Sequence, residues 1–462
     1  MYFFWSASRI FIFLVDFKLC SHLAVSHSTV GLLPGFEGPL PFELETGYVG
    51  VDESEDVQLF YYFVKSETNP KEDPVLLWLT GGPGCSTLSA LLYEIGPLNF
   101  GIAEYNGSLP TLVLNPNSWT KVSSIIFVDL PVGTGFSYAK TPLAFQSGDI
   151  KASHQTYEFL RKWLMNHPEF LSNPVYVGGD SYVGITLPPV VQLISNGNEE
   201  GIQPFVNLKG YILGNPITLP TLEQNSTIPF AHRMGLISDE LYESLKRDCG
   251  GDYQNIDPSN TECLRDLQDY IECISGIQTA QILEPLCSFF ATPKLPDQIS
   301  GERRLQDENS RGLHDLEPTG CRSYGYLLSH YWVNDDSVQE ALHIKKGSIG
   351  EWQRCTFGLQ YTAFEIKSSF EYHVNLSTKG YRALIYSGDH DMIVPFFATQ
   401  AWIKSLNYSI VDDWRSWIVQ GQVAGWVPNL NLGASGGGHT APEYKPEECY
   451  AMFKRWISEE PL

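Results

Sequence analysis

The chain has 462 residues, of which 43% are hydrophobic, and 53 acidic against 30 basic residues give it a formal net charge of −23. Such an acidic surface repels a phosphate backbone, so nucleic acid is excluded as an expected partner. The length allows two or three domains, but the motifs described below run from the first hundred residues to the last thirty, so we expect one large domain, residues 27–462, to hold them.

The first 26 residues resemble a secretory signal peptide. Arg9 precedes the apolar run 10–15, and the region near Ser26 is suited to cleavage. Eight cysteines follow this leader, together with sequons at Asn106, Asn225, Asn375 and Asn407. We therefore expect the secretory pathway, with the vacuole or the extracellular space as destination. No later run approaches the roughly 20 apolar residues of a membrane span, so no membrane partner is expected.

An apolar strand is predicted at residues 75–80, followed by the glycine-rich loop 81–86 (GGPGCS). Backbone approaches another group most closely at glycine, so the amide of Gly82, together with that of Tyr182, can form an oxyanion hole. The alternative is that a Gly-Pro-Gly sequence forms only a turn.

Strands and helices alternate further along the chain. Apolar strands are predicted at 124–129 and 208–213, and one helical face carries Tyr157, Leu160, Trp163 and Leu164. This alternation predicts a mostly parallel sheet with helices on both faces.

Residues 176–184 (YVGGDSYVG) read as a buried strand, a turn around Ser181 and a helix. A serine at such a turn presents its hydroxyl to a cleft above the positive end of the helix, which is the position of a nucleophile. The match is imperfect, because Val183 stands where the usual pattern has glycine and Gly184 follows it. The alternative is an ordinary turn serine between glycines.

Residues 224–331 are richer in acids and cysteines and separate two halves of the predicted core. We interpret them as an insertion that caps the cleft. Within it, the charged run 300–310 with the dibasic Arg303-Arg304 reads as a solvated loop, which is a conceivable site of chain cleavage.

A serine nucleophile needs a base and an acid that orients the base, and both occur later in the chain. The predicted strand 381–387 leads into Asp389, His390 and Asp391, of which we favour Asp391 as the acid and expect Asp389 to bond the loop. His439 follows three glycines and precedes a predicted helix that begins at Pro446. The chain order serine, aspartate, histidine is that of the α/β-hydrolases.

Two other interpretations of these segments are disfavoured. The Asp-His-Asp trio at 389–391 could hold a metal ion, but no second ligand group lies at a recognised spacing. Residues 433–438 resemble a phosphate loop only in glycine content, since no lysine follows them. We therefore expect neither metal nor cofactor.

Together these segments resemble a plant-type serine carboxypeptidase-like protein, of the peptidase family that also contains glucose-ester-dependent acyltransferases. The resemblance runs from about Leu33 to the C-terminus. It rests on six stretches, at residues 39–50 (PLPFELETGYVG), 78–86 (WLTGGPGCS), 129–138 (DLPVGTGFSY), 176–184, 388–391 (GDHD) and 439–444 (HTAPEY).

The resemblance implies an α/β-hydrolase fold and a set of site residues. Ser181, Asp391 and His439 would form the catalytic triad, Gly82 and Tyr182 the oxyanion hole, and the substrate would contact Thr80, Gly81, Asp180 and Glu94. It also implies three disulfides, Cys85 with Cys355, Cys249 with Cys263, and Cys287 with Cys321, and it leaves Cys273 and Cys449 without assigned partners.

Peptidases of this family grip the substrate's terminal carboxylate with an asparagine before the double glycine and with two glutamates. Here Thr80 replaces the asparagine, Asp180 replaces one glutamate, and Glu94 is kept. Because threonine offers one short hydroxyl where asparagine offers an amide, this clamp is weaker. We therefore favour transfer of an acyl group, of phenolic type, from a glucose ester to an alcohol acceptor.

Two alternatives stay open. The first is a serine-type carboxypeptidase that releases residues from peptide C-termini. The second is a catalytically impaired relative, because only residues 427–435, with little β-branched content, replace a longer stretch with a strand before His439. On that reading His439 is poorly positioned.

Overall fold

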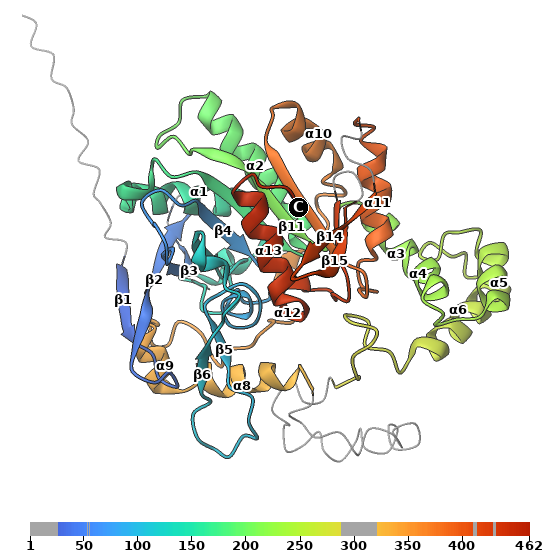
Figure 1. Cartoon of the computed structure of the whole chain (residues 1–462), viewed down its shortest axis with the longest axis horizontal. Coiled ribbons are helices and arrows are strands. Elements are labelled where there is room, and N and C mark those ends of the chain that lie inside the picture. The colour runs from blue at the N-terminus through green and yellow to red at the C-terminus, as the bar shows by residue number, and fades with distance from the viewer. Residues whose placement is uncertain (1–25, 53, 55, 288–320, 410–413, 428–430) are drawn as a thin grey trace, which may run out of the picture.

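A computed structural model describes residues 26–287 except 53 and 55, together with 321–409, 414–427 and 431–462 (Figure 1). The predicted leader up to residue 25 and the dibasic loop at 300–310 lie outside the described residues. In the described part of the chain, no helix is long and apolar enough to cross a membrane.

One large mixed sheet dominates the structure, with the strand order β1-β2-β3-β7-β4-β10-β11-β13-β16-β15-β14, and β8 paired to β3. Its centre is parallel. The central strands are β7 (Ser124–Val128), β4 (Val75–Leu79), β10 (Val175–Asp180), β11 (Leu208–Gly214), β13 (Arg382–Gly388) and β16 (Asn431–Ala434). Runs such as 75–79 and 124–128 form central strands because every side chain in them is buried, as expected where both faces of a sheet are covered.

Antiparallel strands flank this centre at both edges. They are β1 (Ser26–Leu32), β2 (Pro39–Val51), β3 (Val57–Val64) and β8 (Tyr138–Ala139) on one side, and β15 (Gln422–Val427) and β14 (Arg415–Val419) on the other. The predicted fold class is thus confirmed, with a parallel arrangement that is limited to the middle of the sheet.

Helices cover both faces of the sheet, and each face has its own core. One core includes Trp163, Leu187 and Leu376, and its helices are α1 (Asp149–Asn166), α2 (Val183–Glu199), α10 (Phe370–Thr378) and α11 (Phe396–Ser405). The other core includes Trp332 and Phe453, and its helices are η1 (Ala90–Glu94), α8 (Tyr324–Val333), α9 (Asp336–Ala341), α12 (Ala441–Tyr444) and α13 (Pro446–Ile457).

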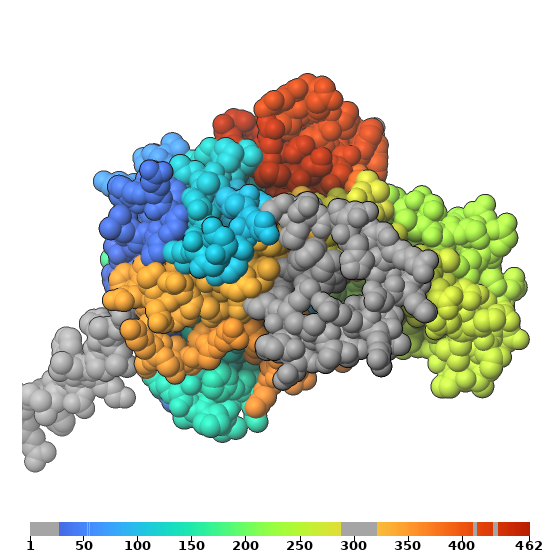
Figure 2. All heavy atoms as spheres, turned by 90° about the horizontal axis from the view of Figure 1, so that it is seen from below, coloured from blue at the N-terminus to red at the C-terminus, as the bar shows by residue number. Residues whose placement is uncertain are grey.

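A third, smaller core lies among the helices of the predicted insertion. These are α4 (Thr227–Arg233), α5 (Asp239–Cys249) and α6 (Thr261–Ile274), and their core includes Phe230, Leu245 and Tyr270. Figure 2 shows this part of the chain, in light green, standing out from the rest of the surface. Helix α3 (Pro220–Asn225) precedes these helices and packs through Leu222 against the core that contains Trp163. Helix α8 falls within the predicted interval 224–331 but packs in the larger core around Trp332. The boundaries of the cap stay a prediction.

The remaining elements are short. They are β5 (Leu98–Phe100), β6 (Leu112–Leu114), η2 (Trp119–Lys121), η3 (Pro142–Phe145), β9 (Ser147–Gly148), η4 (Pro168–Phe170) and β12 (Tyr361–Thr362).

The segment before His439 differs from its prediction. The sequence predicts no strand within residues 427–435, yet β16 pairs in parallel with β13, from Ile385 opposite Asn431 to Gly388 opposite Ala434, and antiparallel with β15. Pairing on both sides supplies the hydrogen bonds that hold this sequence extended in spite of its low β propensity. The prediction that this segment contains no strand is therefore wrong.

Candidate active site

Ser181 stands at the sharp turn between β10 and α2. Its φ is 59°, a left-handed conformation that a serine adopts only where the surroundings impose it. Its backbone N–H donates to Gly214 O at 2.9 Å, and its own carbonyl accepts from Gly184 and Ile217. The turn therefore holds the serine rigidly at the carboxyl end of the central sheet.

The glycines around Ser181 are required by close packing. A Cβ on Gly179 would lie 2.6 Å from Val183 Cγ1, and one on Gly184 would lie 2.4 Å from Ile217 O. The position after the serine that requires glycine in this turn is thus Gly184. Val183 occupies the position where the usual pattern has glycine, and its side chain is buried.

The structure brings the three predicted triad residues together. His439 Nε2 lies 2.7 Å from Ser181 Oγ, and His439 Nδ1 lies 2.8 Å from Asp391 Oδ2. Asp391 is fully buried, and its Oδ1 accepts from the backbone N–H groups of Ile393 at 2.8 Å and Val394 at 3.2 Å. This is a continuous hydrogen-bonded chain from a buried carboxylate through an imidazole to a hydroxyl.

Asn215 is a fourth member of this chain that sequence reasoning missed. It follows β11, and its Nδ2 donates to Asp391 Oδ2 at 2.7 Å. Its backbone N–H donates to Tyr386 O, which fixes it against the neighbouring strand. The sequence offers one signal that could have found Asn215. This residue closely follows a predicted strand, at the edge of the sheet where Ser181 and Asp391 are also expected.

The electrostatic surroundings favour a proton on His439. Burial lowers the pKa of His439, but the Asp391 carboxylate, its hydrogen bond to the ring and the Asp180 carboxylate outweigh burial, so the pKa is raised overall. An imidazole with a raised pKa is a better proton acceptor for a serine hydroxyl.

The glycine-rich loop lies directly against the serine turn. A Cβ on Gly81 would lie 2.7 Å from Ser181 Cβ and 2.9 Å from Tyr182 N. The N–H of Gly81 is used by Asp180 Oδ1 at 3.0 Å. In the part of the chain that the structure describes, the backbone amides of Gly82 and Tyr182 donate to no other group. Donors of an oxyanion hole are expected to be free in this way before a substrate binds.

A buried carboxylate holds the far end of this loop. Asp129 Oδ1 accepts from Ser86 Oγ at 2.6 Å and from Thr87 N at 3.0 Å, and its Oδ2 accepts from Phe136 N at 2.9 Å. A disulfide from Cys85 to Cys355 ties the loop to a second segment. The loop is thus anchored independently of any substrate.

The residues predicted to contact substrate include two buried carboxyl groups. Burial raises the pKa of Asp180 to about 6, although the Gly81 N–H and His439 act against it. Burial, with Asp180 and Glu443 nearby, raises the pKa of Glu94 well above its usual range. Among the described residues, Glu94 Oε2 and Thr80 Oγ1 are buried without hydrogen-bond partners, so both can still bind a polar substrate group.

One cavity adjoins the serine turn, and a second, larger one is lined by none of the residues predicted to act in catalysis or to contact substrate. The smaller cavity, of about 20 Å³, is bounded by Thr80, Gly81 and Tyr182. The larger one, of about 430 Å³, has Tyr93, Phe100 and Arg322 in its wall, together with Glu443, whose charge reaches Asp180. The larger volume is typical of pockets for small molecules.

The other predicted residues are placed as follows. All three predicted disulfides are present, and Cys273 and Cys449 are unpaired, the first exposed and the second buried. Asp389 Oδ1 accepts from Gly436 N, which agrees with the expected loop bond. Of the sequons, three are exposed, at Asn106, Asn375 and Asn407, whereas Asn225 is partly buried and bonded to residues 252 and 253.

Comparison with known proteins places the chain in a family. A sequence model of the serine carboxypeptidase family matches residues 34–459. The chain belongs to the serine carboxypeptidase family. Serine carboxypeptidase-like 7 of Arabidopsis thaliana is 55% identical over 442 residues, which cover 95% of this chain and 94% of that protein. Serine carboxypeptidase-like 19 of the same plant is 53% identical over 464 residues, or 98% of this chain and 99% of that protein.

A solved structure supports the fold. The prohormone-processing carboxypeptidase Kex1Δp from Saccharomyces cerevisiae superimposes with a TM-score of 0.66 over 90% of this chain and 91% of that one, at 20% identity. The comparisons thus show the family and the α/β-hydrolase fold of this chain. The two Arabidopsis relatives are named serine carboxypeptidase-like proteins.

Proposed function

We propose that this serine carboxypeptidase-like protein is an acyltransferase. It moves an acyl group, of phenolic type, from a glucose ester to an alcohol acceptor, through an ester on Ser181. The observation that carries the proposal is the hydrogen-bonded chain from Asp391 through His439 to Ser181, at 2.8 and 2.7 Å. It argues against a catalytically impaired relative.

The first half of the reaction forms the acyl-enzyme. His439 Nε2 takes the proton of Ser181 Oγ as this oxygen attacks the ester carbonyl, and Asp391 stabilises the imidazolium. The oxyanion accepts from the free amides of Gly82 and Tyr182. When the tetrahedral intermediate collapses, the bond to glucose breaks, and glucose leaves with the proton from His439.

The second half transfers the acyl group. His439 removes the proton of the acceptor alcohol, whose oxygen attacks the acyl carbonyl, and Ser181 Oγ leaves and recovers its proton from His439. Water competes with the alcohol at this step, so a transferase must favour the alcohol. The atoms balance without a metal or cofactor.

The choice of transfer over peptide release rests on Thr80. A peptide's terminal carboxylate needs hydrogen-bond donors, and the Thr80 hydroxyl, though buried without a partner in the described chain, is a single short donor. An uncharged substrate such as an ester has no terminal carboxylate and so does not need these hydrogen-bond donors.

A specific observation favours the second candidate, a carboxypeptidase. Asp180 and Glu94 both have raised pKa values, so at mildly acidic pH each can carry a proton and donate it to a carboxylate. The sequons, the disulfides and the leader-like N-terminus support a route through the secretory pathway for either enzyme, to the vacuole or the extracellular space.

Product analysis separates the candidates. The glycosylated protein is incubated at mildly acidic pH with a phenolic glucose ester, a panel of alcohols and a blocked dipeptide, and all products are quantified by mass spectrometry. We expect new esters that are absent with Ser181→Ala. Cleaved dipeptide without a new ester would instead establish the peptidase.

Thr80→Asn tests the reasoning on specificity. The added amide restores a donor for a carboxylate, so dipeptide cleavage should rise by about tenfold relative to ester formation, which corresponds to one added hydrogen bond to a charged group. Thr186→Asn, at another residue that lines the small cavity, is the matched control and should not change the ratio. An unchanged ratio in Thr80→Asn would contradict the role given to Thr80.

A further inference from the structure

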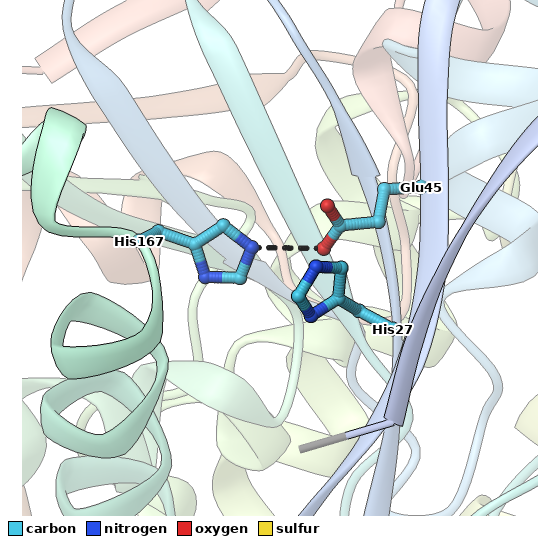
Figure 3. Close-up of side chains that lie close together, drawn as sticks. All are labelled: His27, Glu45 and His167. Carbon is cyan, nitrogen blue, oxygen red and sulfur yellow. Dashed lines mark hydrogen bonds and ion pairs between the residues drawn. The ribbon is translucent and has the colours of Figure 1, made fainter. Parts of the chain in front are cut away.

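Three potential metal ligands meet at the β1 edge of the sheet, outside the candidate active site. Figure 3 shows the rings of His27 and His167 beside the Glu45 carboxylate. His27 comes from β1, Glu45 from β2 and His167 from the end of α1. One ligand atom of each residue lies within 4.8 Å of those of the other two. His167 Nε2 and Glu45 Oε1 are 2.9 Å apart.

The strand register explains why these side chains share a face. In the antiparallel sheet His27 lies opposite Gly47, and Thr29 lies opposite Glu45. Residues two apart on a strand point to the same face, so His27 and Glu45 are diagonal neighbours on it. Gly47, which has no side chain, leaves room between them. His167 reaches this face from the C-terminal end of α1, which packs against β2.

His167 is oriented as metal-bound histidines are. Its Nδ1 lies 2.9 Å from Trp163 O, a bond in which the ring must donate because a carbonyl only accepts. Nε2 is therefore the ring nitrogen that faces Glu45. Without a metal it donates to Glu45 Oε1, and a zinc ion bound here would replace this proton. The ring is also stacked on Trp163, with centroids 4.0 Å apart, and is only 4% exposed. Metal-binding histidines are held by such a bond from the other ring nitrogen.

Glu45 has supporting contacts of the same kind. The Tyr61 hydroxyl donates to Glu45 Oε1 at 2.7 Å, and Tyr61 is fully buried against α1 through Phe159. This leaves lone pairs on both carboxylate oxygens, since a carboxylate accepts about four hydrogen bonds. Two of the three ligands are therefore held in place by buried neighbours.

We propose that His27, Glu45 and His167 bind a divalent zinc ion, with water in the fourth position. Zinc lies about 2.0–2.2 Å from nitrogen and oxygen ligands, so two ligand atoms of a tetrahedral site lie about 3.3–3.6 Å apart. His167 Nε2 and Glu45 Oε1, at 2.9 Å, must separate slightly to admit the ion. His27 is exposed, so its ring is free to close the small remaining gap.

The ligand set selects among metals. Two imidazoles and one carboxylate suit zinc and its transition-metal neighbours, whereas magnesium and calcium prefer sites made of oxygen alone. The three ligands come from three different elements, β1, β2 and the end of α1, so an ion bound by them would hold these elements together. It would link the first described strand, which lies at the open edge of the sheet, to the end of α1.

The test measures zinc binding directly. The secreted, glycosylated protein is made in a Cys273→Ser background, because the exposed Cys273 thiol is a competing ligand, and intact mass confirms that the mature chain keeps His27. Zinc affinity is measured at pH 7.5 by competition with a chromophoric chelator. Cobalt(II) substitution then reports the coordination number through its d–d absorption.

Four variants separate binding from folding. We expect one zinc per chain, with affinity lowered about tenfold or more by His27→Ala, Glu45→Gln and Tyr61→Phe. His27 is exposed, so its loss leaves the fold intact, and Tyr61→Phe removes only the hydroxyl that supports Glu45. His232→Ala is the matched control, because His232 pairs with Asp239 and, among the described residues, belongs to no group of three potential ligands, so this variant should bind zinc like the parent.

Zinc should also slow hydrogen exchange in β1, and His27→Ala should abolish this protection. The proposal is overturned if the parent binds no zinc, if His27→Ala binds it as tightly as His232→Ala does, or if the mature chain begins after His27.

Discussion

Asp391→Asn is the most direct test of how the proposed catalytic residues work. In the native protein Asp391 Oδ1 accepts from two backbone amides, and Oδ2 accepts from Asn215 and from His439 Nδ1. The backbone donors cannot turn away, so in the variant the side-chain amide oxygen must face them. The new amide nitrogen then faces His439.

This reversal changes which ring nitrogen of His439 carries the proton. An amide N–H facing Nδ1 makes Nδ1 an acceptor, so the proton moves to Nε2, 2.7 Å from Ser181 Oγ. A protonated Nε2 cannot take the serine proton. The equivalent change in a well-studied serine protease lowers the rate about 10⁴-fold, or about 5.5 kcal/mol of transition-state stabilisation, and we expect the same here.

The assay needs no knowledge of the natural substrate. A fluorophosphonate labels activated serines, and its rate of reaction with Ser181 is followed by intact mass. Asp389→Asn is the control, since Asp389 bonds the loop at Gly436 and does not contact His439, and its rate should stay within about threefold of the parent. Thermal melting checks that both variants fold. Labelling of Asp391→Asn within about tenfold of the parent would refute this account of the proton's position.

Three further predictions concern the site and the surface. The labelling rate should rise with pH as His439 loses its proton, and the midpoint of this rise should lie above the ordinary histidine value because the pKa of His439 is raised. Asp180→Asn should lower the midpoint, since it removes a negative charge that favours the imidazolium. An unchanged midpoint in this variant would contradict the role given to Asp180. Gly81→Ala should cut the rate about 100-fold or more, because its Cβ would press on the serine turn, while Gly276→Ala, where a Cβ meets nothing within 4 Å, serves as control. Glycopeptide mapping should find lower occupancy at Asn225, whose amide is engaged in the fold, than at Asn106, Asn375 and Asn407; equal occupancy would contradict it.

Sequence alone located the central strands because each is an apolar run buried on both faces, as at residues 75–79 and 124–128. It failed at β16, where the strand is held by neighbours on both sides that lie far away in sequence. Local composition contains no information about such pairing. The sequence predicts close backbone approach at the glycines of residues 81–86, but it does not show that Gly184 is equally crowded, where a Cβ would lie 2.4 Å from Ile217 O.

The same limit applies to side chains that converge over long distances. His167 and Glu45 are 122 residues apart in sequence, and neither belongs to a spacing pattern that indicates a ligand. Asn215 could be placed at the correct edge of the sheet, but its bond to Asp391 depends on the rotation of both side chains. Such contacts follow from the fold, and a pattern search along one chain does not reach them.

The order of the strands explains how four distant segments build one site. The neighbours β10, β11, β13 and β16 run in parallel, so their carboxyl ends lie at one edge of the sheet. Ser181 directly follows β10, Asn215 directly follows β11, and Asp391 lies three residues beyond β13. His439 lies five residues beyond β16. The short strand that the sequence did not predict is therefore the one that carries the base, and four paired residues suffice because the strands beside it already fix their direction.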